Sequence, residues 1–118
     1  MSPVYLAFFM REEDFRKELK RLALPREKWP SFIYTGNAAT HFIEYRGKPA
    51  CIVCMPIQAN HSTEQYHALL VHEAVHVWQY IRERMGEDRP SSEFEAYSIQ
   101  GIAQELMLAF KAQRSKKK

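Results

Sequence analysis

The first part of the chain carries apolar residues at helical spacing. In REEDFRKELKRLALP, charged residues surround Phe15, Leu19 and Leu22, which recur every three to four positions. Pro25 closes this stretch, so we predict an N-terminal amphipathic helix that ends before the proline.

The residue pattern that follows is typical of β-strands. Residues 31–45, SFIYTGNAATHFIEY, indicate strand material interrupted by a turn at residues 35–37. The segments HFIEY and PACIVC flank the turn signal Arg46-Gly47, and this combination predicts a hairpin. We therefore expect a small antiparallel sheet of about three strands.

The second half of the chain returns to helical spacing. Ser62 and Gln65 fit a capping box, which predicts a long helix that runs to about Met85 with Gly86 at its stop position. After a short connector, residues 92–110 predict a last helix. Its apolar stripe is formed by Ile99, Ile102, Ala103, Leu106 and Phe110. The order helix, small sheet, helix, helix indicates an α+β fold.

Length and charge narrow the class of protein. The chain has 118 residues and no repeat, which predicts one domain over residues 1–113 and a basic, disordered tail over 114–118. The net charge is +3, and much of it comes from that tail. A basic chain end of this kind is more often solvated than bound to nucleic acid, so we expect no nucleic-acid partner. With no long apolar run and no basic leader, we expect no membrane partner and a cytoplasmic location.

Two cysteines, Cys51 and Cys54, have the C-x-x-C spacing of zinc and redox sites. Their apolar surroundings predict a buried strand, on which residues three apart point to opposite faces. We therefore expect both thiols to be buried for packing and not to share a metal ion.

The segment LLVHEAVHVWQY places His72, Glu73 and His76 in the order H-E-x-x-H on an apolar helix. The two imidazoles are one turn apart, so they lie on one face and can share a tetrahedral zinc ion. Glu73 projects about 100° from His72 and suits a general base better than a third ligand. Satisfied polar groups in a core are the other interpretation, but the position among apolar residues favours a metal site.

A catalytic zinc ion needs a third protein ligand. The last predicted helix offers Glu93 and Glu95 in SSEFEAYSIQ. The combination of H-E-x-x-H with a later glutamate resembles the gluzincin peptidases. That resemblance favours Glu93 as the ligand, with Tyr97 where these families more often have Asp or Asn. Glu95 stays open because it directly precedes Ala96, as in the thermolysin type, although a capping box with Ser92 explains Glu95 structurally.

The size and element order of the chain are similar to those of the minigluzincins. FFMREEDF, KWPSFI, LLVHEAVHVWQ and PSSEFEAYSIQ also resemble metallopeptidase-like proteins of tailed phages and prophages. The resemblance implies a zinc metalloendopeptidase that acts on a peptide or protein substrate, bound by a strand at residues 50–55. Glu73 would be the base, and Tyr97 or His41 would stabilise the oxyanion.

The alternative is a non-catalytic zinc-binding module of phage assembly or host interaction. The intact Glu73 argues against it, since structural zinc needs no base. The sequence does not indicate an oligomeric state.

Overall fold

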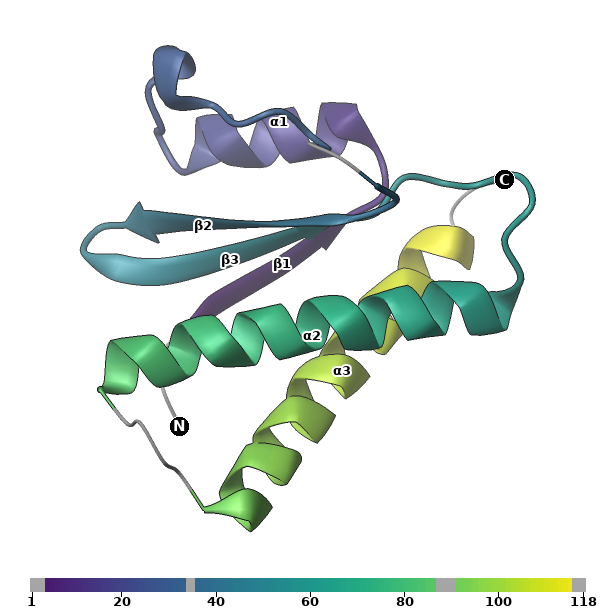
Figure 1. Cartoon of the computed structure of the whole chain (residues 1–118). Coiled ribbons are helices and arrows are strands. Elements are labelled where there is room, and N and C mark those ends of the chain that lie inside the picture. The colour runs from purple at the N-terminus through teal and green to yellow at the C-terminus, as the bar shows by residue number, and fades with distance from the viewer. Residues whose placement is uncertain (1–3, 34–35, 87–90, 116–118) are drawn as a thin grey trace.

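The computed structural model describes residues 4–33, 36–86 and 91–115. Over these residues, three strands and three α-helices follow one another, with a short 3-10 helix after the first α-helix (Figure 1). The elements are β1 (Tyr5–Phe9), α1 (Glu12–Arg21), the 3-10 helix (Arg26–Lys28), β2 (Ala39–Tyr45), β3 (Lys48–Cys54), α2 (Thr63–Met85) and α3 (Ser92–Ser115). The expected α+β class is confirmed.

The sheet is mixed and has the order β1-β3-β2. β3 is antiparallel to β2 but parallel to β1, so the expectation of an entirely antiparallel sheet was wrong. The strand expected near residue 31 is not formed by residues 31–33, and residues 34 and 35 lie outside the described residues. Instead Tyr5–Phe9 forms the third strand, and α1 lies in the long crossover that a parallel pair requires.

The β2–β3 hairpin is confirmed. Tyr45 is paired with Lys48 across Arg46 and Gly47, whose φ angles are 53° and 78°. Two consecutive residues with positive φ are typical of the two-residue turn that matches the twist of antiparallel strands.

β3 is the centre of the core. Cys51 and Val53 pack with α2 and α3, whereas Ile52 and Cys54 pack with α1, which covers the other face of the sheet (Figure 1). Both cysteines are free and buried on opposite faces, as predicted. Burial raises the pKa of the Cys51 thiol to about 12 and raises that of Cys54 further, so both stay protonated near neutral pH.

The two long helices begin and end at specific signals. The predicted capping box of Ser62 and Gln65 is confirmed, and Gly86 ends α2 with a φ of 71°. At α3, Ser91 Oγ accepts a hydrogen bond from the Phe94 backbone N–H, so the capping box predicted for Ser92 and Glu95 was wrong. No helix among the described residues has the length and apolar character needed to cross a membrane.

α3 extends to Ser115, beyond the predicted boundary at residue 113. Residues 114 and 115 of the expected tail are therefore helical, and residues 116–118 lie outside the described residues. Near this end, the Gln113 amide donates to the Phe8 carbonyl and accepts from the Met10 N–H, at 2.6 and 3.1 Å. The free edge of β1 is thus closed by a side chain.

Candidate metal centre

His72 and His76 lie one turn apart on α2, and both are exposed. Their Nε2 atoms are 3.2 Å apart. Two imidazole nitrogens at zinc–nitrogen distances of about 2.0–2.1 Å in a tetrahedron would be about 3.3–3.4 Å from each other. The pair therefore fits one metal ion. The same separation also suits a hydrogen bond between one protonated and one unprotonated ring nitrogen.

Glu73, which lies between the two histidines in the sequence, is buried, with 5% of its surface exposed. Its Oε1 atom accepts a hydrogen bond from Thr40 Oγ1 on β2 at 2.5 Å. The helix turns about 100° between His72 and Glu73, which directs the carboxylate toward the sheet while the imidazoles stay at the surface. Thr40 is a site residue that the sequence analysis missed.

These side chains border one cleft of about 730 Å³ between β2 and the first half of α2. Residues 36–40 and Phe42 form its sheet side, and His72, Glu73 and His76 are on its helix side. Two possible metal ligands, a carboxylate and the outer strand of the sheet therefore meet in one place. His61 also lines this cleft, with its ring against that of Tyr66.

The predicted site residues of α3 lie elsewhere. Glu95 Oε2 accepts a hydrogen bond from the Trp78 indole at 2.8 Å, and Glu93 and Tyr97 are exposed. Trp78 lies about 240° around α2 from His72, so α3 packs on a side of α2 that faces away from the imidazoles. Glu93, Glu95 and Tyr97 do not line the cleft.

His41 also lies outside the cleft. It follows Thr40 on β2, so its side chain points to the opposite face of the sheet, where its ring stacks on Phe15 at 5.1 Å. Its Nε2 atom is 3.0 Å from the Phe32 carbonyl oxygen. Burial lowers the pKa of the His41 imidazole, although that hydrogen bond and the nearby Glu73 carboxylate act in the opposite direction. These contacts give His41 a structural role.

The structure brings together the predicted site residues of α2, whereas those of α3 lie outside the cleft. In residues 4–33, 36–86 and 91–115, no three His, Cys, Asp or Glu side chains are grouped so that they could hold a metal ion. The paired imidazoles of His72 and His76 suit zinc and other divalent transition metals. No family model, curated protein or solved structure matches the chain.

Proposed function

We propose that this chain is a zinc-dependent peptidase with Glu73 as its general base. The observation that supports the proposal most strongly is the 3.2 Å separation of the His72 and His76 nitrogens beside a carboxylate in the same cleft. Both imidazoles are exposed, so a place in the core does not account for them.

In this proposal, His72 and His76 hold the zinc ion, which when bound would polarise a carbonyl group and make a water molecule more acidic. Glu73 accepts the proton of the attacking water and later donates it to the leaving amine. Thr40 occupies Oε1 of Glu73, so we assign the proton transfer to Oε2. The hydroxyl group thereby fixes the direction in which the carboxylate presents its reactive oxygen.

The substrate would be an extended peptide segment. β3 is paired on both sides, so the predicted peptide-binding strand at residues 50–55 was wrong. β2 borders the cleft, and among the described residues no strand pairs with its outer side. An extended peptide can add to such an edge through backbone hydrogen bonds, which places its carbonyl groups along the cleft.

The second candidate function is the non-catalytic zinc-binding module. Structural zinc sites usually have four protein ligands and catalytic sites three, whereas among the described residues no three His, Cys, Asp or Glu side chains are grouped to hold a metal ion, so either function needs a further ligand. The resemblance to gluzincins proposes Glu93, or Glu95, for the third position. Glu95 is the less suitable of the two because it already binds the Trp78 indole.

Metal analysis of chain purified without chelators tests the zinc site. We expect about one zinc ion per chain, lost in His72→Ala and in His76→Ala but kept in Glu73→Gln, since the carboxylate is not a ligand. His67→Ala is the matched control, because His67 is on α2 outside the cleft. Less than about 0.2 zinc per chain without uptake on titration would contradict a site that binds zinc as structural and catalytic sites do.

A peptide-library digest read by mass spectrometry separates the two candidate functions. Peptidase activity should appear in the zinc-loaded chain and disappear with a chelator and in Glu73→Gln. Zinc-loaded chain that cleaves nothing in the library favours the binding module. Cuts present equally in all samples would come from a contaminating peptidase.

A further inference from the structure

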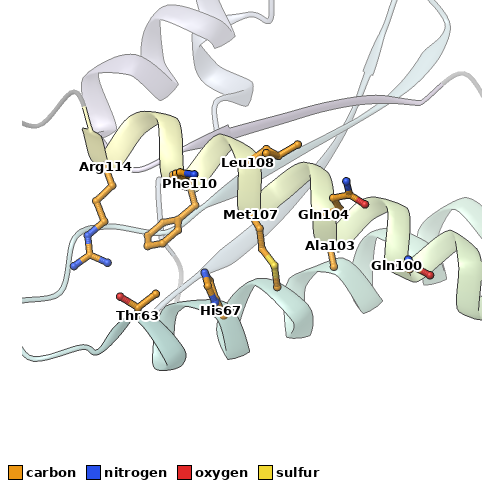
Figure 2. Close-up of a pocket in the computed structure, with 10 residues that line it drawn as sticks. Thr63, His67, Gln100, Ala103, Gln104, Met107, Leu108, Phe110 and Arg114 are labelled. Carbon is orange, nitrogen blue, oxygen red and sulfur yellow. The ribbon is translucent and has the colours of Figure 1, made fainter.

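A groove of about 920 Å³ lies between the start of α2 and the second half of α3. The first two turns of α2 form one wall, and residues between positions 100 and 114 of α3 form the other. Figure 2 shows Met107, Phe110 and Arg114 pointing from α3 toward the first turns of α2. The rise along α3 from residue 100 to residue 114 is about 21 Å, so the groove is long as well as open.

The middle of the groove is apolar. Ala103, Met107 and Phe110 line it there, opposite the ring of His67, which meets the Phe110 ring edge-on at 5.9 Å. Sites for small molecules are commonly clefts of about 300–1,000 Å³ with mostly apolar walls and a few polar groups. The groove has that volume and that kind of wall, so the body of a ligand that fits it is apolar.

Positive charge is confined to one end of the groove. Lys111 and Arg114 line the end at the last turns of α3, whereas Gln100 and Gln104 line the opposite end. None of the described residues that line the groove is acidic. A molecule with an apolar body and one anionic end therefore matches both the walls and the charge, whereas a cationic molecule of the same shape would meet like charges.

Arg114 is held at the charged end by two aromatic rings. Its guanidinium carbon lies 4.8 Å from the centre of the Tyr66 ring and 5.4 Å from that of the Phe110 ring. A guanidinium that stacks through its face keeps its N–H groups at the edge of its plane, where they can donate to a carboxylate. The ring contacts thus position the cation without neutralising it.

A purely structural explanation accounts for part of this arrangement. The helix dipole favours basic residues in the last turn of α3, and the stem of Arg114 covers aromatic surface. Neither effect explains why an open apolar groove begins beside two cations. The juxtaposition of the groove with charge at one end is the observation that points to a ligand.

We propose that this groove binds a single-chain anionic amphiphile, such as a long-chain carboxylate. The acyl chain lies along Met107, and the carboxylate lies at Lys111 and Arg114. The source is a monomer in solution, because a groove between two helices receives one chain, whereas a membrane needs a broad apolar face. The groove is on the α3 side of α2, away from the cleft with His72 and His76, so this proposal and the proposed zinc site can fail independently.

Calorimetric titration of the full chain with two ligands of equal chain length tests the proposal. Below its micelle concentration, one decanoate should bind per chain with a Kd of about 10–500 µM. Decyltrimethylammonium should bind at least about tenfold more weakly, because its charge has the wrong sign. Each methylene added to the carboxylate should tighten binding about three- to fourfold until the groove is filled.

Substitutions in the groove locate the two parts of the ligand. Lys111→Gln and Arg114→Gln should each weaken decanoate binding about two- to tenfold. Met107→Glu should weaken it at least about tenfold, because it places a carboxylate against the acyl chain. Lys17→Gln, at an exposed position on α1 outside the groove, is the matched control and should leave the Kd unchanged. Circular dichroism confirms that the variants are folded.

The two-ligand comparison uses the unaltered chain, so it decides the proposal even where a variant does not fold. No binding of decanoate up to about 5 mM would overturn the proposal, as would equal affinity for both ligands. Binding that persists in folded Met107→Glu would also overturn it. Binding to phosphatidylglycerol vesicles without binding to decanoate monomers would replace the ligand site with a membrane contact.

Discussion

The polar side chains on the two sides of α2 differ in burial and in hydrogen-bond partners. On the side of α3, the Trp78 indole donates a hydrogen bond to Glu95, and both groups are held within the packing of the two helices. On the cleft side, His72 and His76 are exposed and face each other, with the buried Glu73 beside them. The need to satisfy buried polar groups explains the Trp78–Glu95 pair, but it does not explain two exposed imidazoles. We therefore expect changes on the α3 side to alter stability and changes on the cleft side to alter chemistry.

The largest expected effect is on the cleft side. Glu73→Gln should reduce peptidase activity about 10²–10⁴-fold, because the amide cannot accept the proton of the attacking water. Its carbonyl oxygen can still accept the Thr40 hydrogen bond, so the free energy of unfolding should change by less than about 1 kcal/mol. The measurement is the rate of peptide cleavage at equal zinc content. Full activity in this variant would remove Glu73 from the proposed mechanism.

The α3 side should show the reverse behaviour. Glu95→Leu leaves the Trp78 N–H without its acceptor and should lower the free energy of unfolding by about 1–3 kcal/mol, with zinc binding unchanged. Glu93→Gln is the control at an exposed position and should change stability by less than about 0.5 kcal/mol. Urea denaturation and zinc titration of both variants give the result. Loss of zinc in either variant would restore the ligand that the gluzincin resemblance implies and would break the division between the two sides.

Local signals allowed most helices and the hairpin to be predicted. The capping box of Ser62 and Gln65 marks the start of α2 and Gly86 marks its end, and the Arg46-Gly47 turn fixes the β2–β3 pairing. The parallel strand β1 was missed because its partner Ala50–Cys54 is 45 residues away, and a short apolar run does not reveal its pairing.

Only the part of the site that lies on a single helix, α2, could be predicted from the sequence. His72, Glu73 and His76 are positioned by helical geometry alone, so their spacing follows from the sequence. Thr40 could not be found, because its contact with Glu73 depends on how β2 packs against a helix 33 residues later. The placement of Glu95 depends likewise on the crossing of α2 and α3, which brings it to Trp78.

Removal of the Thr40 hydroxyl should have a smaller effect. Thr40→Val keeps the shape of the side chain but removes the donor to Glu73 Oε1. Water in the cleft can replace it, so we expect a stability loss of about 0.5–1.5 kcal/mol and a loss of peptidase rate of up to roughly tenfold. Thr40→Ser, which keeps the hydroxyl, should retain most of both. A rate loss in Thr40→Ser equal to that in Thr40→Val would show that the hydrogen bond is not what positions Glu73.

The smallest expected effect concerns His41, which is buried on the face of the sheet that α1 covers. Burial lowers the pKa of His41 in the folded chain below its unfolded value of about 6.5. Between these two values the unfolded chain binds the proton more readily, so the free energy of unfolding should fall as the pH decreases from about 6.5 toward the folded pKa of His41.

Urea denaturation between about pH 7.5 and pH 5 measures this slope, with a chelator present because metal binding to imidazoles also depends on pH. His41→Gln should flatten the slope. If instead the slope persists in His41→Gln and disappears in His72→Gln, the coupling of pH to stability belongs to the cleft. The open side of α2 would then contribute to folding, contrary to the division drawn here.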